Sequence, residues 1–210
     1  MCGKFRQRRT WQQVHDLYEL LTPYIGEVAT VTPMRFASVL VLDDAGKPVI
    51  RQMRWGYPRA GSDAPGNVPG HIHARAETVD TLPTFASAFR ERRGLLLVES
   101  FNEGEEVTPR KTRQHTITPK DGKPLGIAVI YEHWVNEAGG ELYTFAMLTT
   151  AANALVGTIT DRMPAVIKAE DWDAWLHGGS KELLVPLSGD WNMVEERSRS
   201  EGKGPADLFQ

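Results

Sequence analysis

The sequence contains a single cysteine, Cys2, among 210 residues. One cysteine permits no disulfide within the chain and no zinc site built from several cysteines. Long hydrophobic runs are also missing, because apolar runs such as residues 39–42 and 95–98 fall far short of the ~18 residues that a membrane span needs. Four of the first nine residues are basic, but no apolar segment follows them as it would in a secretory signal. These absences predict a soluble, cytoplasmic protein with no membrane partner.

The chain has no excess of positive charge, since 27 acidic and 24 basic side chains leave a formal charge of −3. This balance argues against an indiscriminate polyanion binder. Basic residues nevertheless gather in three segments, which are residues 4–9, 90–93 and 110–113. A local basic groove is therefore compatible with the mildly acidic whole. The hydrophobic fraction of 41% is ordinary for a globular chain of this length, which predicts one domain with a sizeable core.

Hydrophobic patterning predicts more strands than helices. Strands are expected at residues 38–42, 49–55, 71–77, 95–101, 125–134, 141–149 and 163–167, with two hairpins among them. Helices are expected from Thr10 to the residues before Pro23, at 82–93, at 151–156 and around Trp172 and Trp175. The predicted fold is α+β, with an antiparallel, barrel-like β-sheet core and flanking helices. A single domain is expected over residues 1–194, followed by a polar tail over 195–210. A long surface loop is expected at residues 57–70, and loops of that length in compact domains are often functional.

The expected strand at residues 71–77 places polar side chains on one face. Because side chains alternate along a strand, the polar set comprises His71, His73, Arg75 and Glu77. Two histidines and a carboxylate could bind zinc or iron, and this remains an alternative. The charge of Arg75 between them opposes a dication, so we predict neither a metal nor another cofactor.

The beginning of the chain offers a distinctive nucleophile. If Met1 is removed, Cys2 carries a free α-amine beside its thiol. The amine titrates near ~8 and the thiol near ~8.5, so both are partly nucleophilic at neutral pH. A 1,2-aminothiol condenses with an aldehyde to an imine, and the thiol then closes a five-membered thiazolidine. It can also act as an N-terminal nucleophile in acyl transfer.

Five short motifs occur in a fixed order along the chain. They are MCGKF at residues 1–5, RWG at 54–56, ARAET at 74–78, FASAFRERR at 85–93 and DRMP at 161–164. Each is weak alone, but together they are specific. Over roughly residues 1–187 the chain resembles the SOS response-associated peptidase (SRAP) family, which shields abasic sites in single-stranded DNA through a covalent link to its N-terminal cysteine.

This resemblance implies catalytic roles for two residues. Cys2 corresponds to the nucleophile that captures the ring-opened sugar aldehyde. The family's catalytic glutamate lies in a Gly-aromatic-aromatic-Glu-Trp stretch after a buried strand, and here residues 100–104 read SFNEG, so Glu103 takes that role. A carboxylate there can move protons during imine formation and ring opening. Glu105 is the rival for this role, and an ordinary loop carboxylate is the alternative for Glu103.

The resemblance also implies DNA contacts. Arg75 and Arg162 correspond to the family's phosphate-binding arginines, and Lys4 stands where the family usually has arginine. Lysine keeps the charge but loses the bidentate geometry. Trp55 could stack on a base, although a tryptophan at a strand end also suits the core.

Two positions depart from the family pattern. Before ARAE the family has an asparagine that helps to hold the cysteine amine, and this chain has His73. Before DRMP the family has a histidine that assists proton transfer, and this chain has Thr160. Capture by Cys2 is compatible with both changes. The steps that need a proton, such as strand scission or release, are the ones that these changes affect. Thr160 is therefore the candidate at the proton-transfer position, and the alternative is that His73 has taken over this role from a neighbouring strand.

The expected partner is single-stranded DNA with abasic sites, bound by a monomer. The family name implies peptidase activity that removes Met1, although a host aminopeptidase could do the same, and the crosslinking chemistry leaves room for lyase activity. One alternative is a class II glutamine amidotransferase, which also begins Met-Cys-Gly. That family typically uses an Asn-Gly pair, and this chain has none. The other alternative is a non-catalytic DNA-binding module.

Overall fold

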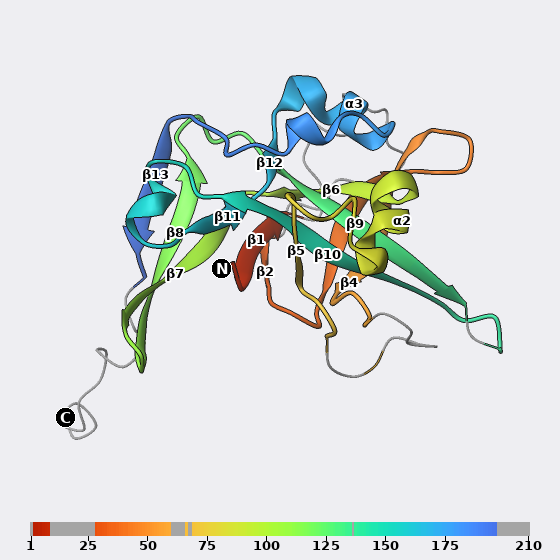
Figure 1. The fold of residues 1–210 in the computed structure, drawn as a ribbon, viewed down its shortest axis with the longest axis horizontal. Helices are drawn as coiled ribbons and strands as arrows, with labels where there is room; N and C mark the ends of the chain where they lie inside the picture. The colour runs from red at the N-terminus through yellow and green to blue at the C-terminus, as the bar shows by residue number, and fades with distance from the viewer. Residues whose placement is uncertain (1, 9–27, 60–65, 67–68, 136, 197–210) are drawn as a thin grey trace, which may run out of the picture.

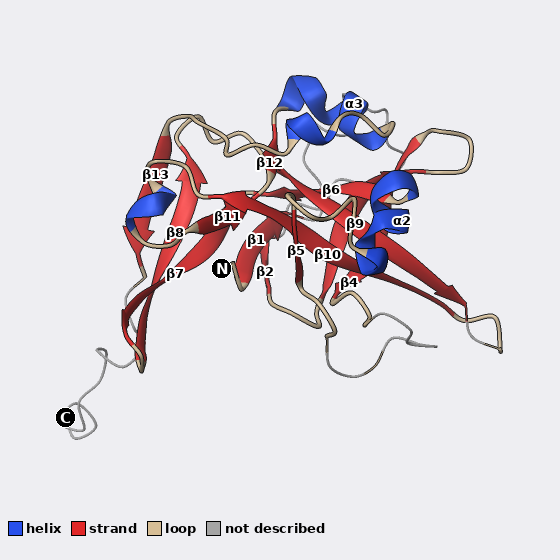
Figure 2. Ribbon diagram, viewed as in Figure 1, coloured by secondary structure: helices blue, strands red, loops and turns tan. Residues whose placement is uncertain are grey.

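The structure is a computed structural model that describes residues 2–8, 28–59, 66, 69–135 and 137–196. Strands dominate it, and the described residues contain only two α-helices (Figures 1 and 2). The prediction of an antiparallel, barrel-like β core with flanking helices is confirmed. The helix expected from Thr10 lies outside the described residues, as does part of the expected loop at 57–70.

Five strands close into a barrel in which each strand pairs with two neighbours. They are β3 (Phe36–Leu42), β4 (Pro48–Trp55), β6 (Arg93–Val98), β9 (Leu125–Val135) and β10 (Glu141–Ala151). Around the barrel β3 pairs with β4, β4 with β10, β10 with β9, β9 with β6, and β6 with β3. Only the β4–β10 pairing is parallel. The two expected hairpins are β3–β4 and β9–β10.

Three short strands extend this sheet. β5 (His73–Arg75) pairs in parallel with β10, β11 (Arg162–Pro164) pairs antiparallel with β10, and β12 (Val166–Ile167) pairs antiparallel with β9. The ARAET and DRMP motifs therefore meet on the same barrel strand, which places two segments far apart in sequence side by side.

A second sheet of five strands lies beside the barrel and runs from the left of Figure 1 to the middle of the molecule. Its strands are β2 (Val28–Val31), β1 (Lys4–Arg8), β7 (Ser100–Thr108), β8 (Lys111–Pro119) and β13 (Trp191–Glu195), neighbours in that order. β1 begins near the middle of the molecule (Figure 1), and Cys2 precedes the first residue of this strand, Lys4, by two positions. β13 extends to Glu195, the first residue of the expected polar tail.

The core has two apolar clusters on opposite faces of the barrel strands. On one side α2 (Pro83–Glu91) packs Phe85 and Phe89 against the barrel, and α3 (Trp172–Leu176) adds Trp175, whose indole donates to the Gly94 carbonyl at 3.0 Å. On the other side Phe5 and its neighbours from the second sheet fill the space, and Cys2 belongs to that cluster.

Four predicted elements differ from the structure. The strand at 163–167 is two short strands, because β11 pairs with β10 whereas β12 pairs with β9. The strand at 95–101 is two strands, because at Glu99 the chain leaves the barrel and its backbone N–H donates to Arg6 of β1. The strand at 71–77 shrinks to His73–Arg75, followed by a turn. The helix at 151–156 is replaced by a 3-10 turn at Val156–Thr158, since β10 continues to Ala151. A continuous apolar run cannot reveal where a chain changes sheets.

Candidate active site

Cys2 lies two residues before Lys4, the first residue of β1, and has no exposed surface. Its Sγ donates to the Lys4 carbonyl at 3.3 Å. Burial raises the pKa of the Cys2 thiol to about 12, and the negative charge of Glu103 adds to this rise. The thiol is therefore protonated at neutral pH, which distinguishes it from a cysteine activated as a thiolate.

Glu103 reaches Cys2 because of the register of two strands. β1 and β7 run antiparallel with Lys4 opposite Asn102, so the next residue of β7 lies beside the residues that precede Lys4. Glu103 is 1% exposed, and burial raises its pKa to about 7. Hydrogen bonding to the Cys2 backbone partly offsets this rise. A carboxyl that titrates near neutrality beside a backbone nitrogen can both donate and accept a proton there.

His73 approaches the backbone of Cys2 from β5. Both of its ring nitrogens are buried, and its ring meets that of Trp55 edge-on at 6.0 Å. Burial lowers the pKa of His73 to about 4, against a smaller opposite effect of the Cys2 backbone. A neutral imidazole at pH 7 offers one hydrogen-bond donor and one acceptor but supplies no proton readily. The structure thus brings together Cys2, which precedes β1, with Glu103 of β7 and His73 of β5.

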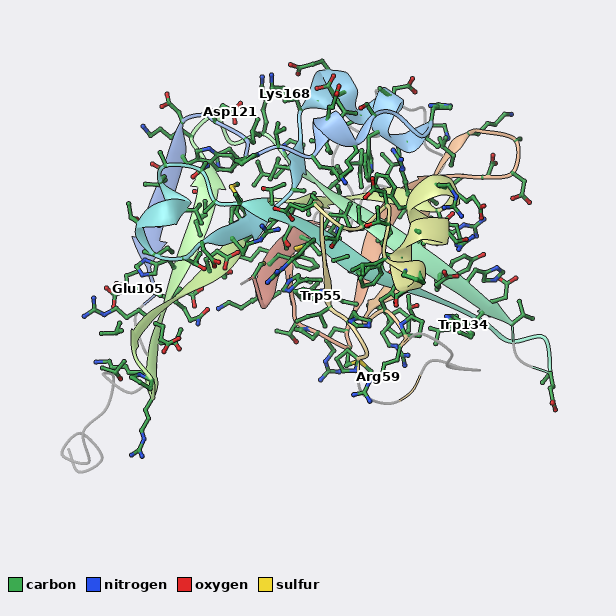
Figure 3. The ribbon with its side chains drawn as sticks, viewed as in Figure 1. Trp55, Arg59, Glu105, Asp121, Trp134 and Lys168 are labelled. Atoms are coloured by element: carbon green, nitrogen blue, oxygen red, sulfur yellow. The ribbon has the colours of Figure 1, made fainter. Side chains whose placement is uncertain are left out.

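The rival carboxylate lies elsewhere. Glu105 Oε2 is 3.1 Å from His115 Nε2 and 3.9 Å from an Arg113 guanidinium nitrogen. Figure 3 places Glu105 on the left side of the molecule, apart from Trp55 in the middle. Of the two candidates, Glu103 is the one that the fold brings to Cys2, and it lies in a strand rather than in the loop of the alternative interpretation.

Thr160 lies just after the 3-10 turn and is half-buried. Its backbone N–H donates to the Val156 carbonyl at 3.1 Å. The next residue, Asp161, is exposed, and its negative charge contributes to the raised pKa of Glu103. Sequence reasoning assigned Asp161 no role, although it stands in the DRMP motif directly after Thr160. The turn therefore places Asp161 within electrostatic range of the Glu103 carboxyl, and Thr160 directly precedes it in the chain.

The three cations predicted to bind DNA differ in their surroundings. Arg75 is exposed at the end of β5. Arg162 forms a bidentate ion pair with Glu77, with nitrogen–oxygen distances of 2.6 and 2.9 Å, and also donates to the Thr149 carbonyl. Lys4 Nζ lies 2.6 Å from Glu196 Oε2. Of these three cations, Arg162 and Lys4 each form an ion pair with a glutamate, whereas Arg75 is exposed to solvent without one in the described part of the chain.

Trp55 requires a correction. It is completely buried, its ring lies 5.2 Å from that of Phe5 and 6.3 Å from that of Phe145, and its indole donates to the Ile72 carbonyl at 2.8 Å. A ring with no exposed face cannot stack on a base, so the interpretation of Trp55 as a DNA contact is wrong for this structure. Trp55 instead packs beside His73.

The alternative metal site is not assembled. The ring of His71 packs edge-on against Phe85 at 5.1 Å, whereas His73 faces Trp55 and Glu77 pairs with Arg162. Across the described part of the chain, no three His, Cys, Asp or Glu side chains gather as metal ligands would. The same residues include no helix that is both long and apolar enough to cross a membrane.

Comparison with known proteins assigns the chain to a family. The sequence profile of the SOS response associated peptidase (SRAP) family matches residues 1–195, so the chain belongs to that family. Two similar relatives are the abasic site processing protein YoqW of Bacillus subtilis and the abasic site processing protein YedK of Escherichia coli. YoqW is 30% identical over 71% of this chain and 70% of its own length, and YedK is 28% identical over 100% of this chain and 99% of its own.

Solved structures share the fold. A protein from Bacteroides thetaiotaomicron superimposes with a TM-score of 0.78 at 20% identity, covering 99% of this chain and 97% of its own. A protein from Bordetella bronchiseptica gives a TM-score of 0.76 at 18% identity, covering 94% of this chain and 100% of its own. Membership of the SRAP family favours abasic-site processing over the activity of a glutamine amidotransferase.

Proposed function

We propose that this chain processes abasic sites in single-stranded DNA by linking them covalently to Cys2. Its family membership and the names of its relatives support abasic-site processing. The observation that carries the covalent mechanism is the position of the Cys2 backbone nitrogen beside the buried carboxyl of Glu103. Removal of Met1, by the protein itself or by an aminopeptidase, turns this nitrogen into a free α-amine.

The chemistry then balances with water as the only by-product. The neutral α-amine adds to the aldehyde carbon of the ring-opened sugar, and the resulting carbinolamine loses water to give an imine. The thiol sulfur adds to the imine carbon while its proton passes to the imine nitrogen, and this closes the thiazolidine. No oxidant, reductant or cofactor is required.

Glu103 has the proton affinity that the dehydration step needs. With a pKa of about 7, a large fraction of it is protonated at neutral pH, so it can donate a proton to the departing hydroxyl. The conjugate carboxylate can then accept a proton from the amine nitrogen. The thiol, with its pKa raised to about 12, reacts after the imine has formed rather than as a free thiolate.

His73 suits a positioning role. A neutral imidazole can accept a hydrogen bond from the Cys2 amine, as the family's asparagine does through its carbonyl oxygen. Its low pKa makes it a poor proton donor at pH 7, so it does not replace the missing histidine at Thr160. The chain therefore forms the adduct efficiently and releases it slowly.

A denaturing gel tests the proposal. Purified protein is incubated with an oligonucleotide that carries one abasic site, and the intact oligonucleotide serves as the substrate control. We expect a heat-stable shifted band with wild type and none with Cys2→Ala, while reversible binding by Cys2→Ala stays within a few-fold of wild type. If Cys2→Ala still forms the adduct, the link is to an amine, either of a lysine or of the N-terminus, and the thiazolidine mechanism is wrong. If wild type binds without forming one, the chain is a DNA-binding module.

A further inference from the structure

Three donors converge on one carboxylate at the end of the second sheet. Glu196 Oε2 accepts from Lys4 Nζ at 2.6 Å, and Oε1 accepts from Asn102 Nδ2 at 2.8 Å and from Thr116 Oγ1 at 3.0 Å. The hydrogen bond from Lys4, followed by those from the other two donors, holds the pKa of Glu196 below its usual range. The carboxylate is therefore charged at neutral pH.

The donors belong to the sheet, not to the segment that carries Glu196. Lys4 pairs with Asn102 between β1 and β7, and Asn102 pairs with Thr116 between β7 and β8. Their side chains thus stand in one row across three strands, and Asn102 also donates directly to Thr116 at 2.8 Å. Asn102 is 1% exposed, which fixes its amide in place. This row would keep its geometry if Glu196 moved away.

Glu196 comes from a segment that joins the sheet only at its edge. It follows the last residue of β13, and its backbone N–H donates to the Gln114 carbonyl at 2.7 Å. Its side chain is 35% exposed, and it stands one residue beyond the part of the chain that matches the family. The carboxylate can therefore leave the row without disturbing the barrel.

The row has the donors that a phosphate needs. An ammonium group, an amide N–H and a hydroxyl can bind the oxygens of a phosphate as well as those of a carboxylate. It also lies close to the candidate active site along the chain, because Lys4 is two residues after Cys2 and Asn102 directly precedes Glu103. A DNA strand whose sugar reaches Cys2 carries phosphates on both sides of that sugar.

We propose that Lys4, Asn102 and Thr116 form a subsite for a backbone phosphate of DNA, and that Glu196 occupies this subsite until DNA displaces it. That the ligand is DNA rests on the proposed function. The resemblance implied a single phosphate contact, from Lys4. The subsite adds Asn102 and Thr116 to it, and adds Glu196 as a carboxylate that competes with the phosphate. Removal of the competing carboxylate should strengthen DNA binding, since the phosphate then meets an unoccupied cation.

The test compares Glu196→Gln with Glu195→Gln. Both remove one negative charge at neighbouring positions, but Glu195 is 57% exposed and lies 3.7 Å from Arg113, away from the row. Affinity for single-stranded DNA is measured over a series of salt concentrations, with Cys2→Ala present in every variant to keep binding reversible. We expect Glu196→Gln to bind about three- to tenfold more tightly. The slope of log affinity against log salt should steepen by about 0.7, whereas Glu195→Gln stays within about twofold of its parent.

A second comparison links the gain to the row. Lys4→Ala should lower affinity several-fold more in the Glu196→Gln background than in the parent, because Lys4 is unpaired only there. Equal effects in the two backgrounds, equal gains from the two glutamate variants, or a lowered melting temperature without tighter binding would each overturn the subsite. Stabilisation of Glu196→Gln by inorganic phosphate with unchanged DNA affinity would also overturn it, since the ligand is then a free anion.

The gel assay separates this outcome from the proposed function. If wild type forms the Cys2 adduct but the two glutamate variants behave alike, only the subsite fails. If no adduct forms while Glu196→Gln still binds DNA more tightly through Lys4, the covalent mechanism fails and the subsite stands.

Discussion

Arg162 and Glu77, 85 residues apart in the sequence, form two parallel hydrogen bonds, Nη1 to Oε1 at 2.6 Å and Nη2 to Oε2 at 2.9 Å. The pair joins the turn after β5 to β11, and Arg162 also donates to Thr149 on β10 between them. Arg162 therefore holds the walls of the candidate site together, in addition to any contact with DNA. Arg75, one strand away, is exposed and makes no such link.

This difference predicts separable effects. Arg162→Ala should lower the free energy of unfolding by about 1–2 kcal/mol. The expected loss is modest because Glu77 is half-exposed and solvent screens the ion pair. Arg75→Ala should leave stability within about 0.5 kcal/mol of wild type, yet weaken DNA binding and reduce its salt dependence. Urea unfolding and binding at several salt concentrations measure both. An unchanged salt slope in Arg75→Ala would remove Arg75 from the DNA groove.

The buried carboxyl predicts a stability that depends on pH. The folded chain raises the pKa of Glu103 from 4.5 to about 7, so it holds the proton more tightly than the unfolded chain does. The protonated Glu103 therefore contributes to the free energy of unfolding fully below pH 4.5, and this contribution is lost as the pH rises to about 7. Wild type should therefore lose about 1–3 kcal/mol relative to Glu103→Gln between pH 4.5 and 7.

His73→Asn is the matched control, because the sign reverses. Burial lowers the pKa of His73 from 6.5 to about 4, so the contribution of the neutral ring is lost as pH falls through that interval. Urea unfolding across this range should show opposite trends for the two variants. Parallel trends would mean that the buried carboxyl is not the group that titrates.

Thr160 predicts slow reversal of the adduct. Reopening a thiazolidine requires protonation of a heteroatom as a bond breaks, and a threonine hydroxyl does not supply that proton at pH 7. Thr160→His should speed release of DNA by about one to three orders of magnitude. His73→Asn should change release little, because the pKa of His73 is about 4. Exchange of a labelled strand measures both rates, and slower release by His73→Asn would assign the proton to His73 instead.

The burial of Trp55 predicts a structural effect. Trp55→Phe should cost about 1–3 kcal/mol of stability, because it leaves a cavity and removes the donor to the Ile72 carbonyl. DNA affinity measured well below the melting temperature should stay within a few-fold of wild type. Weaker binding at unchanged stability would show that the ring contacts a base.

The sequence predicted the barrel well where the hydrophobic pattern was local. The β9–β10 hairpin and α2 follow directly from alternation and from Phe85 and Phe89 on one helical face. The division at Glu99 was not predictable in this way, because residues 95–98 are apolar on both sides of their strand and the apolar pattern resumes at Phe101. Only the pairing with Arg6, almost a hundred residues away, reveals that the chain changes sheets.

The candidate site was predictable mainly through motifs. The motifs pointed to Cys2, Glu103 and His73, and the fold gathers these residues. They did not show that Trp55 is buried, since a tryptophan at a strand end suits either environment. They also missed the effect of Asp161 on Glu103 and the row formed with Glu196, because contacts between segments far apart in the sequence create both.

The most direct test of the covalent mechanism is the intact mass of the adduct formed with abasic single-stranded DNA. The mechanism predicts the mass of the chain without Met1 plus that of the DNA, less one water. Because an imine has the same mass, the adduct is then treated with iodoacetamide under denaturing conditions and with borohydride. A thiazolidine should gain neither a carbamidomethyl group on Cys2 nor two hydrogens. An adduct that retains Met1, or one that takes up either label, would contradict the mechanism.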